Sequence, residues 1–342
     1  MGGGGVAVSV PACVSFLASN PDVSFLLVGD KPQIQSMLSK HKSSNHERIT
    51  IEHTNEVVDD HDTVAHALRN KKHSSMRLAI NAVKDGRAQA CVSGGNTGAL
   101  MAISRFVLKM LPGIDRPAII AKFPSYDLEQ GVYMLDLGAN VDSPPEALLQ
   151  FAMMGSVLAS AQDGIERPRV ALLNIGEESH KGNPVIQESA VLLEQNPSIH
   201  YIGFIEPNMI YSDVADVIVC DGFIGNIALK SIEGTARVIK HFMRSAYEAT
   251  WFNRFLSVIS GSVINRMRHS MSTSRRNGAT FVGLNGIVIK SHGDANIKGF
   301  ANAIKNAYDE INLAIKCIVN FYFNLLAIVA SDSNFSTAFS NR

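Results

Sequence analysis

The stretch Ala90–Met110, ACVSGGNTGALMAISRFVLKM, indicates the fold class of the chain. A short apolar run, ACVS, gives way to a glycine-rich loop, GGNTG, and the loop opens into a segment whose apolar residues recur with the period of a helix. Strand, loop and helix in this order form one unit of a parallel α/β sheet. The stretch therefore predicts a sheet that is covered by crossover helices.

The same alternation recurs along most of the 342 residues, with no fixed-period repeat and no long linker. Short apolar or β-branched runs precede polar loops, and helical segments follow them. The predicted strands are Val23–Val28, Arg48–Glu52, Ala88–Ser93, Ala118–Ala121, Gly131–Leu137, Arg169–Ile175, His200–Ile205, Val217–Cys220 and Gly286–Lys290. Nine such strands predict one large, mostly parallel sheet.

Composition places the chain among globular proteins, because 46% of its residues are hydrophobic and 18% are charged. Thirty-one Lys and Arg balance thirty-one Asp and Glu, so no overall field favours binding to nucleic acid. Cys13, Cys91, Cys220 and Cys317 have no paired spacing, which favours reduced thiols in the cytoplasm over a metal cluster. Met1–Gly5 lacks the features of a secretory signal.

Two segments differ from the α/β pattern. Ile239–Arg276 is helical in pattern and carries seven Lys and Arg against the single acid Glu248, so we expect a helical insertion that protrudes from the body. Ile311–Ala330 is apolar enough to suggest a membrane span, but its Lys and Asn residues favour an amphipathic core helix that runs into a tail. The expected organisation is one α/β domain over residues 1–316 and a divergent tail over 317–342.

Four loops that follow predicted strands combine glycines with polar residues and open a helix, which suits an anion such as phosphate. Asn96, Thr97, Asn140, Asn183 and Asn226 supply neutral donors in these loops. Lys181 adds a cation that could neutralise an oxyanion, although a lysine in a loop is ordinarily a surface charge.

His292 follows another strand end, where it could donate to phosphate or act as a general acid or base; a structural histidine is the alternative. Cys91 and Cys220, at strand ends, fit a core-filling role better than a nucleophilic one. The sequence has neither a Ser-His-Asp order nor an HExxH pair. The expected chemistry is therefore the positioning of reactants without a covalent intermediate, and no metal is expected.

From about Asn20 to Asn312 the chain resembles the phosphate acyltransferase family of bacterial phospholipid synthesis. The resemblance rests on ordered blocks: KKHSSMR (Lys71–Arg77), ACVSGGNTGALM (Ala90–Met101), LPGIDRPA (Leu111–Ala118), LDLGANVD (Leu135–Asp142), QFAMMGSV (Gln150–Val157), PRVALLNIGEE (Pro168–Glu178), KGN (Lys181–Asn183), VCDGFIGNIALK (Val219–Lys230), NGA (Asn277–Ala279) and GLNGIVIKSHG (Gly283–Gly293).

This resemblance implies an enzyme that transfers a long-chain acyl group from acyl carrier protein to inorganic phosphate. The product is an acyl-phosphate, which a glycerol-3-phosphate acyltransferase then uses. It also implies a three-layer αβα fold similar to the isocitrate and isopropylmalate dehydrogenases and the phosphotransacetylases. A homodimer without metal or nucleotide cofactor is expected, in the cytoplasm, with peripheral membrane contact as a further expectation.

The resemblance also assigns expected roles to individual residues. The expected catalytic residues are Lys181, Asn226 and His292, and the expected phosphate- or substrate-binding residues are Asn96, Thr97, Asp136, Asn140, Asn183 and Asp221. The expected contacts with carrier protein or membrane are Trp251, Phe255, Arg254, Arg266 and Arg268, in the helical insertion.

One difference from the family concerns the sheet. The family begins with a strand that ends in a glycine-glycine-aspartate loop, whereas Met1–Gly5 starts inside that loop. This difference predicts unpaired ladder groups beside the pocket, at a cost in free energy unless something covers them. Two other functions therefore stay open: a catalytically impaired dimeric scaffold that binds carrier protein or membrane, and a phosphate acetyltransferase-like enzyme that acts on acyl-CoA.

A nicotinamide dehydrogenase of similar fold is disfavoured. It would call for a dinucleotide site and usually for metal-binding carboxylates, and the sequence has neither GxGxxG nor a clear aspartate cluster.

Overall fold

A computed structural model describes residues 4–41, 47–126, 131–261 and 277–313. Its elements alternate between strands and helices. In chain order they are α1 (Gly5–Ser19), β1 (Phe25–Gly29), α2 (Lys31–Lys40), β2 (Ile49–His53), α3 (Val64–Asn70), α4 (Ser75–Lys84), β3 (Ala90–Ser93), α5 (Thr97–Leu108), β4 (Ala118–Phe123), β5 (Val132–Leu135), α6 (Pro145–Asp163), β6 (Arg169–Leu173), α7 (Pro184–Glu194), β7 (His200–Ile205), the 3₁₀ turn η2 (Pro207–Met209), β8 (Val217–Val219), α8 (Gly222–Glu248), α9 (Trp251–Ile259), β9 (Ala279–Val282) and β10 (Ile287–Lys290). A further helix covers residues 297–313.

All nine strands predicted from the sequence are confirmed, and none of their ends shifts by more than two residues. A tenth strand, β9, was not predicted. It is four residues long, and it pairs antiparallel with both β10 and β4 in the middle of the large sheet.

The large sheet has eight strands in the order β3-β10-β9-β4-β5-β8-β6-β7. Four of its junctions are parallel: β3 with β10, β5 with β8, β8 with β6 and β6 with β7. The three successive junctions between β10 and β5 are antiparallel. Because three reversals change the direction, β3 and β10 run opposite to β5, β8, β6 and β7.

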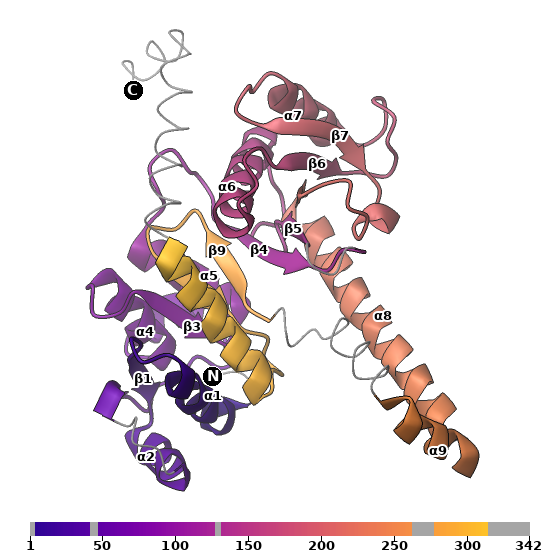
Figure 1. The fold of residues 1–342 in the computed structure, drawn as a ribbon. Coiled ribbons are helices and arrows are strands. Elements are labelled where there is room, and N and C mark those ends of the chain that lie inside the picture. The colour runs from indigo at the N-terminus through magenta and orange to yellow at the C-terminus, as the bar shows by residue number, and fades with distance from the viewer. Residues whose placement is uncertain (1–3, 42–46, 127–130, 262–276, 314–342) are drawn as a thin grey trace, which may run out of the picture.

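Helices cover both faces of this sheet and make the molecule three-layered (Figure 1). On one face, α3, α4, α5 and the first part of α8 pack into the largest hydrophobic cluster. On the other face, α6 and α7 cover β5, β6 and β8, while α1 and the 297–313 helix cover β3 and β10. The expected three-layer αβα architecture is confirmed.

Strands β1 and β2 form a separate two-stranded parallel sheet beside β3, which is the outer strand of the large sheet. Among the described residues, no backbone pairing joins β1 to β3. The two-stranded sheet is held through helices: α4 packs against both β1 and β3, and α1 packs against β1. The ladder is therefore interrupted between β1 and β3.

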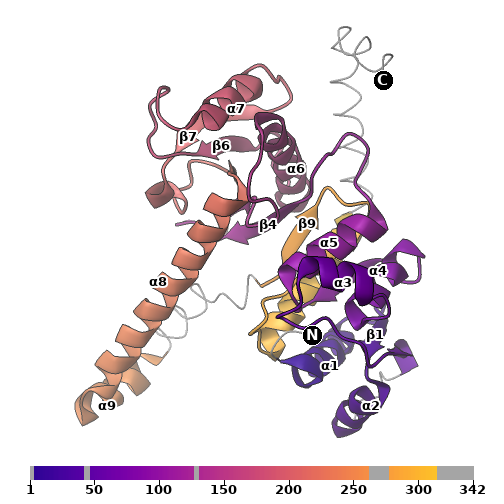
Figure 2. The ribbon, with the colours of Figure 1, turned by 180° about the vertical axis from the view of Figure 1, so that it is seen from behind.

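Helix α8 leaves the body and carries α9 at its far end (Figures 1 and 2). The predicted protrusion is present, and it begins earlier in the chain than Ile239, because α8 runs unbroken from Gly222 to Glu248. Large apolar side chains stay exposed on this arm, which we define as the far part of α8 and α9: Val238, Ile239, Phe242, Trp251, Phe252, Phe255, Leu256 and Ile259.

Within the described residues, none of the helices has the length and apolar character that a membrane span requires. Most of the segment Ile311–Ala330, for which the sequence favours a core helix over a span, lies outside the described residues, as does the tail over 317–342.

Candidate active site

Asp136, at the end of β5, organises the loop that follows it. Its carboxylate is fully buried and accepts five hydrogen bonds: Oδ1 from the backbone N–H groups of Ile119, Gly138 and Ala139, and Oδ2 from the backbone N–H and the side-chain amide of Asn140. Burial raises the pKa of Asp136, although most of these hydrogen bonds favour the ionised form. Because both of its carboxylate oxygens already accept hydrogen bonds from the protein, Asp136 holds the loop in place and is not available to bind a ligand.

The start of α8 packs against this loop at backbone distance. A Cβ at Gly225 would lie 1.9 Å from the Asp136 carbonyl oxygen, and one at Gly222 would lie 2.3 Å from the Asn140 carbonyl oxygen. Both positions therefore require glycine. The approach also brings the exposed side chain of Asn226 against Gly138, which has a positive φ of 124°.

Three of the predicted ligands are helix N-caps. The side chains of Asn96, Asn183 and Asp221 accept hydrogen bonds from the backbone N–H groups of Ala99, Ile186 and Ile224, respectively. Asn96 also donates to the carbonyl oxygen of Asp60 at 3.1 Å. Capping uses one side-chain oxygen in each case, and further N–H groups of each first turn still point out of the helix.

The side chain of Asn140 is also used in internal hydrogen bonds, since its amide nitrogen donates to the Pro117 carbonyl oxygen at 2.7 Å and to Asp136 at 2.9 Å. Thr97, the first residue of α5, is exposed at the helix N-terminus. Of the six residues expected to bind phosphate, Thr97 is therefore the one whose side chain has no structural hydrogen bond within the described part of the chain.

Lys181 lies in the loop between β6 and α7. The Asn174 side-chain amide donates to the Lys181 carbonyl oxygen at 3.2 Å and so fixes the loop backbone. In the part of the chain that the structure describes, the Lys181 ammonium has no hydrogen bond or ion pair. Because β6 and β8 are parallel neighbours, the Lys181 loop and the Asp221–Asn226 loop leave the same edge of the sheet. The Lys181 side chain is half-buried.

The loop after β10 is held by Asn277, which comes just before β9. Asn277 is buried; its amide nitrogen donates to the Ser291 hydroxyl at 2.7 Å, and its Oδ1 accepts from the His292 backbone N–H at 2.8 Å. The imidazole Nδ1 of His292 accepts from the backbone N–H of Asp294 at 3.2 Å. Neutral His292 therefore carries its hydrogen on Nε2.

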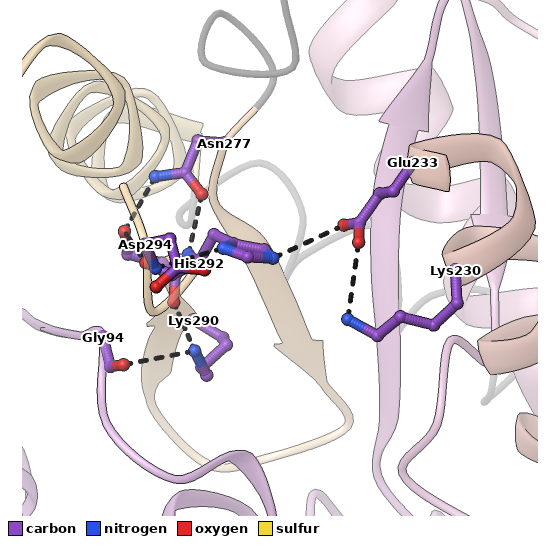
Figure 3. A network of polar contacts seen from close by, with 8 residues as sticks. Gly94, Lys230, Glu233, Asn277, Lys290, His292 and Asp294 are labelled. Carbon is purple, nitrogen blue, oxygen red and sulfur yellow. Dashed lines mark hydrogen bonds and ion pairs between the residues drawn. The ribbon is translucent and has the colours of Figure 1, made fainter. Parts of the chain in front are cut away.

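The Nε2 atom of His292 faces α8 (Figure 3). It lies 3.7 Å from the Glu233 Oε1 atom, and Glu233 Oε2 pairs with the Lys230 ammonium at 3.4 Å. Lys230 is one turn beyond Asn226 on α8, so both lie on the same side of the helix. The contact between His292 and Glu233 connects the two oppositely directed parts of the sheet.

Lys290, at the end of β10, is a site residue that the sequence interpretation missed. Its ammonium donates to the carbonyl oxygen of Ser291 and to that of Gly94 at 3.5 Å, which places it beside the glycine-rich loop before α5 (Figure 3). Burial lowers its pKa to about 8; nearby Asp60 opposes this change and Lys230 adds to it. The signal that the sequence offered for Lys290 was a lysine at the end of a predicted strand, directly before the loop that contains His292.

Taken together, the described contacts join His292, Lys290, Glu233 and Lys230 into one network around the Gly94 loop, while Asn226 and Lys181 approach from the β8 and β6 loops. No described contact links Lys181 directly to His292. The arrangement offers two lysines, free helix N-termini and an oriented imidazole, which suits the binding of an oxyanion and the movement of one proton.

Cysteine and metal chemistry have little support in the described part of the chain. Cys91 and Cys220 are buried, and burial raises the pKa of Cys91 to about 12 and that of Cys220 well above its usual value. Both are thiols at neutral pH and poor nucleophiles. The described His, Cys, Asp and Glu residues form no group of three or more that could hold a metal ion.

Of the five residues predicted to contact carrier protein or membrane, three lie on the arm, away from this network (Figure 1). Trp251 and Phe255 are 80% and 56% exposed, and Arg254 is exposed beside them. Arg266 and Arg268 lie outside the described residues.

Comparison with known proteins gives consistent results. A family model described as "Fatty acid synthesis protein" matches residues 1–316. Proteins named phosphate acyltransferase are 49% identical in Coxiella burnetii, over 93% of both chains, and 45% identical in Legionella pneumophila, over 95% of this chain and 94% of the relative. A crystal structure of a phosphotransacetylase from Streptococcus pyogenes is similar in fold, with a TM-score of 0.61 and 17% identity over 92% of both chains.

Proposed function

The chain belongs to the fatty acid synthesis protein family that includes the phosphate acyltransferases, and on this premise we propose that it transfers a long-chain fatty acyl group from acyl carrier protein to inorganic phosphate. The identity of 45–49% to phosphate acyltransferases over nearly the whole chain carries the proposal. The network of lysines, imidazole and helix N-termini supports it, because each group suits a reaction of phosphate with a thioester.

In the proposed reaction, a phosphate oxygen attacks the thioester carbonyl carbon and a tetrahedral oxyanion forms. The carbon–sulfur bond then breaks, giving acyl-phosphate and the thiolate of the carrier. Hydrogen phosphate loses one proton and the thiolate gains one, so the net reaction needs no other reactant. For this transfer we propose that His292 takes up the other tautomer, in which Nδ1 carries the hydrogen and releases the Asp294 N–H. Nε2 then accepts the proton from phosphate and passes it to the thiolate, and Glu233 stabilises the imidazolium during the transfer.

Lys181 and Asn226 stabilise the oxyanion in this proposal. Lys181 has no ion-pair partner among the residues that the structure describes, and the amide of Asn226 is exposed, so both side chains can turn toward charge that develops on the substrate. Lys290, Thr97 and the first-turn amides of α5 hold the phosphate beside the Gly94 loop. Asp136, Asn140, Asn96, Asn183 and Asp221 keep the loops in position.

The decisive experiment measures acyl-phosphate formation from palmitoyl-acyl carrier protein and phosphate. Lys181→Ala and His292→Ala should each lower kcat by at least a hundredfold without a change in melting temperature. Lys40→Ala, at the exposed end of helix α2, is the matched control and should retain full activity.

Acetyl-CoA and palmitoyl-CoA in place of the carrier-bound substrate test the alternative of an acetyltransferase-like enzyme. A higher kcat/KM with acetyl-CoA would contradict the long-chain proposal. An enzyme that is inactive with all three donors but binds acyl carrier protein would point to a scaffold.

We further propose that the protein works in the cytoplasm as a homodimer, and that the arm contacts acidic acyl carrier protein or the membrane surface. The exposed Trp251, Phe252 and Phe255 supply apolar area, and Arg254 supplies positive charge. Arg254→Glu should weaken carrier binding severalfold at low salt without loss of fold. Unchanged affinity would contradict a role for Arg254 in carrier binding.

A further inference from the structure

A cavity of about 380 Å³ lies between α4, the end of α5 and the loop before β10. None of the described residues that line it is acidic. Its polar side chains are three cations and two amides, from Arg77, Asn81, Lys84, Lys109 and Asn285. We propose that this cavity is a binding site for a small anion with a diphosphate group, separate from the candidate active site.

Three of these residues lie on one side of α4. Arg77, Asn81 and Lys84 follow one another at intervals of four and three residues, which brings them onto the same face of the helix. Lys84 is in the last turn, where the helix dipole favours a cation, whereas Arg77 is in the first turn, where the dipole disfavours one. The helix dipole therefore accounts for Lys84 and leaves Arg77 unexplained.

The cations of this cavity lack partners in the described part of the chain, where none of them makes an ion pair or a side-chain hydrogen bond. Arg77 is nevertheless half-buried. By contrast, the half-buried Arg169 is paired with the carboxylate of Asp216 at 2.8 Å. Burial lowers the pKa of Arg77, but its guanidinium stays charged at neutral pH. A bound anion would supply the partner that the described residues do not.

The ring of Phe106 lies between two of the cations and the solvent-exposed end of α5. Its centroid is 5.0 Å from the Arg77 guanidinium carbon and 4.9 Å from the Lys109 ammonium nitrogen. The two charges are therefore no more than about 10 Å apart, which is about one Debye length in 0.1 M salt, so they repel each other. A cluster held by cation–π contacts without a ligand is the alternative. It accounts for Arg77 and Lys109, but not for Lys84 or the two amides.

The backbone of Lys109 supports a role for its side chain. Lys109 ends α5 with a φ of 66° and a ψ of 176°, a conformation that is strained for residues other than glycine. The backbone N–H of Asn285 donates to the Lys109 carbonyl oxygen at 3.0 Å, and a bridge between Met110 and Leu284 follows directly. These contacts hold the strained turn. Such strain is typical of ligand sites, and glycine, which would relieve it, would remove the cation.

The charge of the cavity indicates the class of ligand. A phosphate ester carries a charge of about −1.5 to −2 at pH 7, so a single phosphate does not match three cations, whereas two linked phosphates do. A guanidinium binds phosphate through two parallel hydrogen bonds, and ammonium groups bind it as point charges. The amides of Asn81 and Asn285 can donate to further oxygens. Free pyrophosphate and a nucleoside diphosphate both carry this group.

The cavity and the candidate active site lie at opposite ends of β10 and α5. Asn285 comes just before β10, whereas Lys290 ends it. Helix α5 begins at Thr97, beside the Gly94 loop, and ends at the cavity; its twelve residues span about 18 Å. A diphosphate in this cavity would therefore not occupy the candidate active site.

The test measures pyrophosphate binding to the full chain by isothermal titration calorimetry at low salt. Arg77→Gln and Lys109→Gly should each raise the Kd at least tenfold. Lys109→Gly should not lower the melting temperature, because glycine adopts this backbone conformation without strain, so its loss of binding would not reflect a loss of fold. Arg105→Gln is the matched control. It removes an exposed cation of α5 that is not among the residues lining the cavity, and it should change the Kd less than twofold.

Lys290→Met separates this cavity from the candidate active site and should leave the binding of pyrophosphate to the cavity unchanged. A Kd that rises in Lys290→Met but not in Arg77→Gln or Lys109→Gly would place pyrophosphate at the candidate active site and overturn the proposal. No binding at millimolar pyrophosphate would also overturn it. Citrate is a carboxylate anion of similar charge, and an equal affinity for citrate would contradict a site for diphosphate.

ADP in place of pyrophosphate identifies the source of the diphosphate group. Tighter binding of ADP would point to a nucleotide, and tighter binding of pyrophosphate would point to the free ion. Either result supports the site if Arg77→Gln weakens the binding at least tenfold. Since none of these measurements uses catalysis, they are independent of the proposed acyl transfer.

Discussion

The Nε2 atom of His292 lies 3.7 Å from Oε1 of Glu233, although the two residues come from oppositely directed parts of the sheet. His292 follows β10, and Glu233 lies on α8, which follows β8. This contact brings the loop of β10, held by Asn277, against the helix that carries Asn226 and Lys230.

Loss of the carboxylate at Glu233 should impair the proposed proton transfer. Glu233→Gln keeps the size of the side chain but removes the charge that stabilises an imidazolium, so kcat should fall about tenfold, equivalent to about 1.4 kcal/mol. Glu188→Gln changes an exposed residue of α7; it is the matched control and should leave kcat unchanged. Steady-state kinetics with palmitoyl-acyl carrier protein give kcat for both variants. A kcat of Glu233→Gln equal to that of the unmodified protein would exclude a role for the contact between His292 and Glu233.

Lys290 should make phosphate binding depend on pH. Its pKa of about 8 means that the ammonium is charged below pH 8 and loses its charge as the pH rises through that value. The KM for phosphate should therefore rise between pH 7 and 9. Lys290→Met should have a higher KM at pH 7 and a flatter profile over this range. A steep rise retained in Lys290→Met would show that another group is responsible.

The Asp136 loop should be needed for stability as well as for activity. Asp136→Ala removes the acceptor of five hydrogen bonds and leaves buried N–H groups unsatisfied, which should cost about 2–4 kcal/mol of unfolding free energy. Gly225→Ala should have a comparable effect because of the 1.9 Å contact. Urea unfolding measures both, and a stable but inactive Asp136→Ala would instead indicate direct contact with substrate.

Glu310 should make the folded state less stable as the pH rises. It is buried beside Thr280, and burial raises its pKa from 4.5 to about 7. Between pH 4.5 and 7 the unfolded state has released this proton, while the folded state still holds it. The contribution of Glu310 to the free energy of unfolding is therefore most favourable below pH 4.5 and is lost as the pH rises to 7. Glu310→Gln should stabilise the protein at pH 8 by at most about 3 kcal/mol relative to its effect at pH 5. Thermal unfolding at the two pH values tests this, and an equal effect at both would exclude it.

The strands and the loops of the candidate site could be predicted because each depends on local sequence. Apolar runs before glycine-rich loops gave the nine strands, and the resemblance of the loops gave the family. The short β9 was missed because ATFV (Ala279–Val282) has no crossover helix after it, and the sequence pattern for parallel units does not detect an antiparallel insertion.

The roles of the loop side chains were harder to predict. Asn and Asp are both the common N-caps and suitable phosphate ligands, so the sequence alone does not separate a cap such as Asn183 from a ligand. The partnership of His292 with Glu233 depends on how α8 crosses the sheet, and no local pattern encodes a contact between residues so far apart in the chain.

Helix α8 is continuous, and its two ends lie in different surroundings. Its first turn packs against the Asp136 loop at Gly222 and Gly225. Its third and fourth turns carry Lys230 and Glu233. Its far end extends away from the body together with α9. Because the helix is continuous and packed at its first turn, a tilt of its far end would also move Glu233 relative to His292. The far end of α8 and the contact between Glu233 and His292 thus belong to one continuous helix.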